Sequence, residues 1–125
     1  TADHSHTMTI AGYSRRNNPI LGLSSFGIEP NKAADGKTYT TLGYANGPGA
    51  ACEEGATVCG RDNPTQDQAL NKNYIQQSRV PLGSETHGGE DVAILARGPG
   101  ANLVSGVMEQ HEIFQVMGRS LNLVE

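Results

Sequence analysis

Long apolar runs are missing from this sequence, and none approaches the length of a membrane-spanning helix. Basic residues are also scarce: 9 Lys and Arg stand against 13 Asp and Glu, which gives a formal net charge of −4. A nucleic-acid partner would require a basic patch. The sequence therefore predicts neither a membrane span nor a nucleic-acid-binding surface. No secretory signal peptide is visible either.

Apolar side chains are few as well, at 36% of residues, and tryptophan is absent. A chain of 125 residues can form one domain or two small lobes, and it buries about two-thirds of its surface if it folds alone. The mean hydropathy of −0.44 and the 16 glycines predict a thin core and many loops. Thr1 is not Met and lies inside a dense polar motif, whereas a domain boundary normally falls in a linker. We therefore expect the N-terminal part of a larger protein to precede this chain.

The N-terminal motif is the first candidate site, because residues 1–6 contain Asp3, His4 and His6 within one short stretch. Carboxylate oxygens and imidazole nitrogens are standard Zn²⁺ ligands. In an extended chain His4 and His6 would share one face and Asp3 the other, so Asp3 and His4 reach one metal only if the backbone turns. The alternative interpretation is a solvated polar loop end, and the motif alone does not decide between the two.

A second candidate site surrounds His87, which is followed by Gly88 and Gly89. Two glycines let the backbone bend sharply and approach a ligand closely. The apolar run over residues 92–96 predicts a buried strand directly afterwards. His87 is therefore expected on a loop that precedes a core strand.

The remaining pattern predicts short elements separated by turns. We expect strands over residues 7–10, 20–23, 38–44 and 74–82, one short helical turn within residues 62–73, and an apolar-faced, core-packing helix within residues 107–123. His111 on that helix is expected to be structural or exposed. The pair Arg15 and Arg16 could clamp a phosphate, but a solvated loop pair is favoured because no helix N-terminus or glycine nest lies nearby.

Cys52 and Cys59 are the only cysteines in the chain. An even count with close spacing favours a disulfide loop, which would indicate an oxidising compartment. Two free thiols are the alternative. A zinc site is disfavoured, because zinc-binding cysteines usually stand closer together and a second ligand pair is absent.

The sequence resembles the alkaline phosphatases along nearly its whole length. Residues 1–6 look like the family's Thr-Ala-Asp-His-x-His metal motif, and residues 85–93 look like its Glu-Thr-His-Gly-Gly-Glu-Asp-Val-Ala motif. Further matches, in the same order as in the family, cover residues 18–23, 37–41, 46–49, 98–99, 106–110, 114 and 116–117. The weakest match, residues 50–72, corresponds to the family's most variable region. The resemblance adds support to the disulfide.

The resemblance implies an α/β fold: the C-terminal part of an alkaline-phosphatase-like sandwich, in which helices flank a central mixed sheet and a β-rich crown lobe is inserted. Residues 1–35 would be a core segment with the Asp-His motif. Residues 36–82 would form the crown lobe. Residues 83–125 would be a core segment with the His87 motif, a strand and the C-terminal helix.

The resemblance also implies hydrolysis of phosphomonoesters by two zinc ions through a phosphoserine. Asp3 and His4 would bind the zinc on the nucleophile side, and His87 would bind the other. His6 would not bind metal itself but would orient a ligand carboxylate. The nucleophilic serine, the phosphate-binding arginine, the remaining zinc ligands and the magnesium ligands lie upstream in the family, so Ser5 and Ser84 are rejected as nucleophiles.

The implied partners are the upstream portion of the same enzyme, a second copy in a homodimer and a phosphomonoester substrate, in a periplasmic or extracellular location. The isolated chain would be inactive. The alternative is a non-catalytic zinc-binding or interaction module derived from the fold. The chain departs from the family at Asn102, Glu112 and Gln115, where relatives often carry His or an aromatic residue; these positions concern surface or dimer details.

Overall fold

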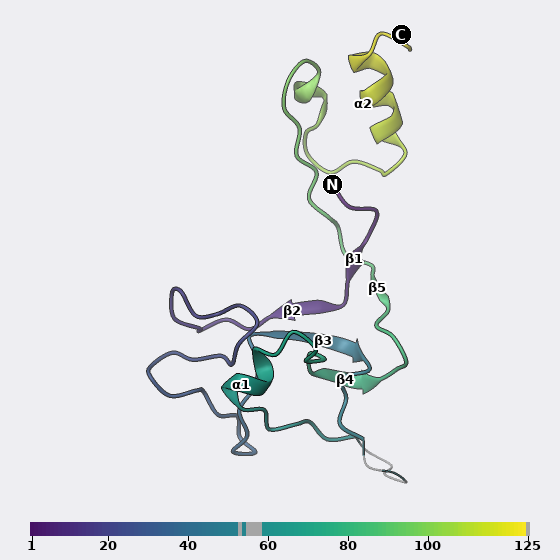
Figure 1. Ribbon diagram of the computed structural model, residues 1–125. Helices are drawn as coiled ribbons and strands as arrows, with labels where there is room; N and C mark the ends of the chain where they lie inside the picture. Colours follow the sequence, from purple (N-terminus) through teal and green to yellow (C-terminus); the bar gives the residue numbers. More distant parts are fainter. Residues whose placement is uncertain (53, 55–58, 125) are drawn as a thin grey trace. The chain divides into compact units, whose positions relative to one another are not determined.

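The computed structural model describes residues 1–52, 54 and 59–124 (Figure 1). The chain forms two compact units, which are treated separately: Thr1–Asp3 with Asp91–Glu125, and His4–Glu90. The division into a core segment, a crown lobe and a second core segment stays a prediction.

Two small sheets organise the larger unit (Figure 1). In the first, β1 (Ser5–His6) pairs antiparallel with β5 (His87–Gly88). In the second, β3 (Leu42–Gly47) lies between β2 (Met8–Ile10), which is antiparallel to it, and β4 (Ser78–Pro81), which is parallel. A parallel pair needs a long crossover, and residues 48–77 provide it. The second sheet is therefore mixed.

The crossover contains the helix α1 (Gln66–Ala69), which confirms the helical turn predicted within residues 62–73. The strand predicted over residues 7–10 is confirmed by β2, and that over residues 74–82 is shorter than predicted. β3 starts at Leu42 rather than Thr38 and extends to Gly47. Before it, Thr38 and Thr40 form only isolated bridges, to Lys32 and Leu23.

The predicted buried strand at residues 20–23 is wrong. Gly22 donates its backbone N–H to the carbonyl of Pro19 at 2.9 Å, which closes a turn. Ile20 and Leu21 are 53% and 50% exposed, whereas Gly22 and Leu23 are buried. The short apolar run was therefore misread, because periodicity over four residues cannot distinguish a strand from a turn.

Hydroxyl groups fill much of the interior of the larger unit. Among the described residues the buried apolar side chains are Leu23, Pro64 and Ala69, whereas the buried hydroxyl residues are Ser24, Ser25, Thr40, Thr41 and Ser78. Ser24 Oγ contacts Ser14 Oγ at 3.0 Å and accepts from Asn31 Nδ2 at 3.1 Å. Asn18 Nδ2 donates to Thr41 Oγ1 at 3.0 Å. This agrees with the thin apolar core that the composition predicts.

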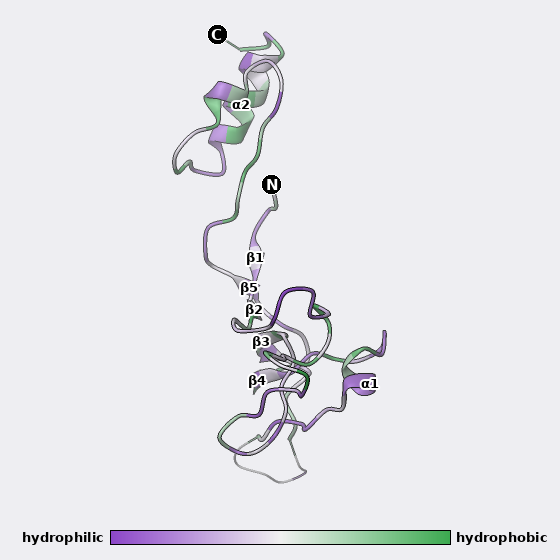
Figure 2. Ribbon diagram, turned by 90° about the vertical axis from the view of Figure 1, so that its left-hand side faces the viewer, coloured by the Kyte–Doolittle hydropathy of each residue, from purple (hydrophilic) through white to green (hydrophobic). Residues whose placement is uncertain are grey.

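The smaller unit contains the 3₁₀ helix η1 (Ala101–Leu103) and the helix α2 (Glu112–Ser120). The buried strand predicted at residues 92–96 is wrong: the segment has no regular structure, and Leu95 is 88% exposed. α2 confirms a C-terminal helix with apolar and polar faces (Figure 2). Its apolar face is exposed rather than core-packed, with Phe114 at 61% and Met117 at 54%. His111, just before it, is exposed as expected.

The structure thus has mixed α/β content, whereas the sandwich with an inserted crown lobe stays a prediction. In the part of the chain that the structure describes, no helix combines the length and apolarity needed to cross a membrane.

Candidate metal centre

The pairing of β1 with β5 brings the two histidine motifs together, although they lie about 80 residues apart in the sequence (Figure 1). His6 stands opposite His87 in the register, and Ser5 stands opposite Gly88. A Cβ atom on Gly88 would lie 2.8 Å from the His6 carbonyl oxygen. Glycine at this position therefore permits the close approach of the two strands.

Three imidazole rings gather at this pairing. The rings of His4 and His87 stack, with centroids 3.6 Å apart and planes at 14°. The His6 ring lies edge-on to both, at 5.2 Å from His4 and 6.1 Å from His87. The structure therefore brings together three of the four residues that the sequence assigns to the metal site.

The hydrogen bond of His4 fixes which ring nitrogen can bind a metal. His4 Nδ1 lies 2.8 Å from the carbonyl oxygen of Ser5, which can only accept, so Nδ1–H is the donor. The lone pair of the neutral ring is then on Nε2. Metal-binding histidines usually hold their other N–H in this way.

His6 Nδ1 is hydrogen-bonded to the Glu85 carboxylate. This bond lowers the pKa of Glu85, aided by the backbone N–H of Thr7 and the charges of His6 and His87. Thr7 N donates to the other carboxylate oxygen at 3.3 Å. The role predicted for His6, orienting a ligand carboxylate, stays a prediction because Glu85 was not among the predicted ligands.

A second carboxylate, Glu90, accepts a hydrogen bond from Ser5 Oγ at 2.6 Å. This bond lowers the pKa of Glu90. Sequence reasoning assigned no role to Glu85 or Glu90. Both stand in the quoted His87 motif, so acidic residues flanking a candidate metal-binding histidine were the signal that could have found them.

Asp3, the fourth predicted residue, belongs to the smaller unit and is exposed. Its backbone carbonyl accepts from Gln110 Nε2 at 3.3 Å. The backbone bends at Asp3 and His4, directly before β1. That Asp3 and His4 bind one ion stays a prediction.

Cys52 and Cys59 are joined by a disulfide bond, which confirms the predicted pairing and rules out the two free thiols. Neither sulfur is therefore a thiolate ligand. Most of the enclosed loop, residues 53 and 55–58, lies outside the described residues.

The donor types fit zinc, but the set is partial. Zinc in proteins takes about four donors, and the prediction gives two to one ion and one to the other. Among the described residues, no three His, Cys, Asp or Glu side chains form a group that could hold a metal ion.

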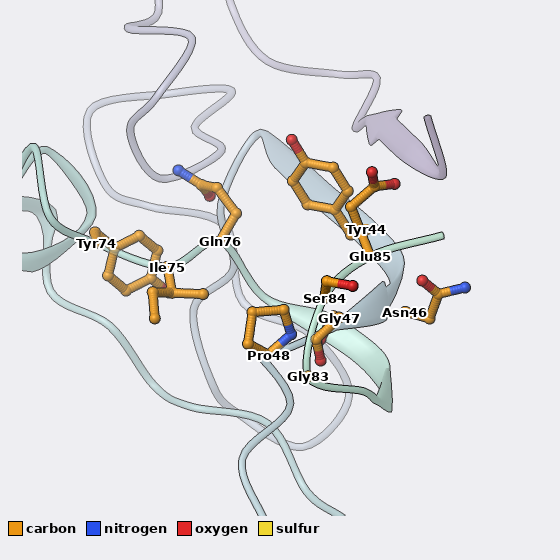
Figure 3. A pocket seen from close by; sticks show the side chains of 11 residues that line it. Tyr44, Asn46, Gly47, Pro48, Tyr74, Ile75, Gln76, Gly83, Ser84 and Glu85 are labelled. Atoms are coloured by element: carbon orange, nitrogen blue, oxygen red, sulfur yellow. The ribbon is translucent and has the colours of Figure 1, made fainter. Parts of the chain in front are cut away.

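A hollow of about 440 Å³ lies beside this region (Figure 3). Burial raises the pKa of the Tyr74 phenol on its wall, with a smaller effect from the Asp62 charge. Glu85 lies on the wall and also contacts His6, so the hollow borders the candidate centre. Its lining consists of Tyr44, Asn46, Gly47, Pro48, Tyr74, Ile75, Gln76, Ser78, Gly83, Ser84 and Glu85.

A family model described as alkaline phosphatase matches residues 1–123. The chain belongs to the alkaline phosphatase family. It is 44% identical over 117 residues to an alkaline phosphatase of Gadus morhua, covering 94% of this chain and 23% of the relative. It is 45% identical to the tissue-nonspecific alkaline phosphatases of Rattus norvegicus and Gallus gallus, covering 94% of this chain and 21% of each relative.

This member of the alkaline phosphatase family therefore spans less than a quarter of the length of the curated relatives that it matches. Both histidine motifs lie inside the matched range of residues 1–123. The resemblance inferred from the motifs is thus confirmed at the level of the family.

Proposed function

We propose that this chain is part of an alkaline phosphatase that hydrolyses phosphomonoesters by two-zinc catalysis through a phosphoserine. The pairing of β1 with β5, which places the His4 ring 3.6 Å from that of His87, is the observation that carries the proposal. It brings together the two motifs that resemble the family's metal motifs. The family membership supports the reaction class.

Within this proposal, Asp3 and His4 hold one zinc and His87 holds the other. A bound zinc pair lowers the pKa of an attacking hydroxyl and stabilises negative charge on the phosphoryl and leaving oxygens. His4 offers Nε2, because Nδ1–H is bonded to the Ser5 carbonyl. His6 and Glu85 fix each other beside the two ligand histidines. The imidazoles bind metal only when neutral, so metal affinity falls on acidification.

The remaining parts of the centre come from outside this chain: the nucleophilic serine, the phosphate-binding arginine, the other zinc ligands and the magnesium ligands. The fraction of each relative that the chain covers, 21–23%, supports this division. Ser5 and Ser84 are rejected as nucleophiles because the family resemblance places the nucleophilic serine upstream of this chain. The complete protein is proposed to be a homodimer with the sandwich and crown architecture.

The proposed location is periplasmic or extracellular. The disulfide between Cys52 and Cys59 supports it, because such bonds persist in oxidising compartments.

Mapping the phosphorylated serine tests this function. Protein made from the whole coding sequence is mixed with p-nitrophenyl phosphate, quenched in acid and digested, and the phosphopeptide is identified by mass spectrometry. The expected result is hydrolysis with a single phosphoserine outside residues 1–125, and full hydrolysis by the Ser84→Ala variant. Phosphate on Ser5 or Ser84 would contradict the proposal. Stoichiometric zinc without hydrolysis would support the non-catalytic module instead.

A further inference from the structure

Asn46, near the end of β3, forms two hydrogen bonds with Thr86, the residue that precedes His87. Its Oδ1 accepts from the Thr86 backbone N–H at 2.8 Å, and its Nδ2 donates to Thr86 Oγ1 at 2.8 Å. One carboxamide thus holds both the backbone and the side chain of Thr86. In Figure 3 this carboxamide turns to the side opposite Tyr74, away from most of the hollow's wall.

The segment that Asn46 holds has little regular structure of its own. Residues 82–86 lie between β4 and β5 and are mostly exposed. Leu82 donates its N–H to the Gly47 carbonyl at 3.2 Å, so the segment starts from the end of β3. Glu85 contacts His6 and Thr7. Asn46 is therefore the point at which the central strand of the second sheet fixes the segment one residue before His87.

We propose that Asn46 is a positioning residue, which sets the Thr86 backbone and thereby the direction of the His87 imidazole. The inference rests on the proposed role of His87 as a zinc ligand. In this role Asn46 contacts neither metal nor substrate. A fixed Thr86 backbone limits the directions that the His87 side chain can take, and a metal ligand needs such a fixed orientation before the metal binds.

The chemistry of the contact separates candidate replacements. Asparagine offers an acceptor and a donor in one rigid group. Aspartate keeps an acceptor for the Thr86 N–H, and the Thr86 hydroxyl can rotate to donate to its second oxygen. Leucine has a similar size but can make neither bond. Asn46→Asp is therefore the conservative variant and Asn46→Leu the disruptive one.

Asn63 provides a matched control elsewhere in the same unit. Its Oδ1 accepts from the Thr38 backbone N–H at 2.9 Å and from Thr38 Oγ1 at 3.1 Å. As at Asn46, one carboxamide contacts the backbone and the hydroxyl of a threonine, but here both contacts are made by Oδ1, and the threonine is not a neighbour of a candidate ligand. Asn63→Leu removes these contacts without touching the His87 segment.

The decisive measurement is zinc affinity, obtained by chelator competition on protein made from the whole coding sequence. Asn46→Leu is expected to weaken zinc binding about 10- to 100-fold, as for other residues that orient metal ligands. Asn46→Asp is expected to restore affinity to within about threefold, because both bonds can re-form. Asn63→Leu is expected to bind zinc like the wild type. Wild-type affinity in Asn46→Leu, or an equal loss in Asn63→Leu, would overturn the inference.

Amide hydrogen exchange separates this inference from the proposed function. Asn46→Leu is expected to accelerate exchange of the Thr86 N–H, and Asn46→Asp to leave it protected. Unchanged exchange in Asn46→Leu overturns the positioning role whatever the zinc content. Wild-type protein without zinc or phosphatase activity contradicts the proposed function. Faster Thr86 N–H exchange in Asn46→Leu than in that wild type would still support the contact of Asn46 with the His87 segment.

Discussion

At the scale of single residues, Arg61 donates three hydrogen bonds to one short segment of the larger unit, residues 35–38. Its guanidinium donates to Asp35 Oδ1 at 2.5 Å, to the Thr38 carbonyl at 2.6 Å and to the Lys37 carbonyl at 3.1 Å. The bond from Arg61 lowers the pKa of Asp35, and the Lys37 backbone N–H adds to the effect. This cluster ties the turn at Asp35 to the chain that follows the disulfide loop.

The lowered pKa of Asp35 makes the stability of this cluster pH-dependent. A carboxyl group whose pKa is lower in the folded than in the unfolded chain stabilises the fold above its unfolded value of about 3.9. That contribution is lost as the pH falls through the lower, folded value. Urea unfolding measured from about pH 6 to pH 3 should therefore lose less free energy in Asp35→Asn than in the wild type. Arg61→Leu should flatten the curve similarly, and acid profiles identical to the wild type in both variants would exclude this linkage.

The residues of the candidate centre were predictable from sequence, but their hydrogen-bond partners were not. His4, His6 and His87 stood out because imidazole nitrogens are standard zinc ligands and because the two glycines after His87 let the backbone approach a ligand closely. The partners depend on strand register: a shift of one residue between β1 and β5 would turn every side chain to the other face. No local pattern determines that register, so Glu85, Glu90 and the Asn46 contact with Thr86 emerged only from the structure.

At the scale of elements, α1 shows how a four-residue helix is held by its cap. Thr65 Oγ1 accepts from the Gln68 backbone N–H at 3.3 Å, and Gln68 Oε1 accepts from the Thr65 backbone N–H at 2.8 Å. This reciprocal capping box satisfies two backbone donors that the helix cannot. It also places Ala69, which is 1% exposed, in the core.

Removal of this cap should destabilise the larger unit. Thr65→Ala is expected to lower the free energy of unfolding by about 0.5–2 kcal/mol, measured by urea denaturation. Thr65→Ser keeps the hydroxyl and should stay within a few tenths of a kcal/mol of the wild type. Equal stability of all three proteins would show that the cap contributes nothing.

Gly49, just after β3, lies so close to the backbone of Gln76, just before β4, that it has no room for a side chain. A Cβ atom at this position would collide with the carbonyl of Gln76, which is backbone and cannot move aside alone. Gly49→Ala should therefore cost about 1–3 kcal/mol or more in thermal unfolding. Gly83→Ala is the control, because a Cβ atom there has no neighbour within 4 Å. A neutral Gly49→Ala variant would mean that the crossover packs differently.

Elements with strong local signals were predictable, and those that depend on a neighbour were not. Alternation identified β2, and the polar segment with Thr65 allowed for α1. The apolar runs at residues 20–23 and 92–96 were read as buried strands, and both predictions are wrong. An apolar run becomes a strand only where another strand pairs with it, and within the described residues neither run has more than one bridge.

At the scale of the whole molecule, the disulfide compensates for a sparse apolar core. Cys52 and Cys59 are 7 residues apart, so their bond restricts the unfolded chain across a short loop. The chain-entropy relation gives about 2–3 kcal/mol for a loop of this size. The Cys52→Ser/Cys59→Ser double variant should lose about that much in urea unfolding. A reducing agent should destabilise the wild type and leave the double variant unaffected; unchanged stability in both cases contradicts this role.

The family could be predicted from sequence because its motifs are local and occur in order, whereas the placement of the larger parts could not. The exposed apolar face of α2 and the partial ligand set share one feature: neither is completed by residues that the structure describes in this chain. Propensity and motif reasoning act on nearby residues, and they contain no information about groups outside the chain.

His87 is proposed to bind one zinc of a phosphatase centre that also contains Asp3 and His4. The most direct measurement is the zinc content, together with p-nitrophenyl phosphate hydrolysis, of protein made from the whole coding sequence, compared with His87→Ala and with His111→Ala as the matched control. We expect two zinc ions in the wild type and in His111→Ala. We expect His87→Ala to lose one zinc ion and to hydrolyse the substrate about 100-fold more slowly or worse, since a catalytic metal contributes several kcal/mol. A His87→Ala protein that keeps both zinc ions and full hydrolysis would contradict the proposed role of His87.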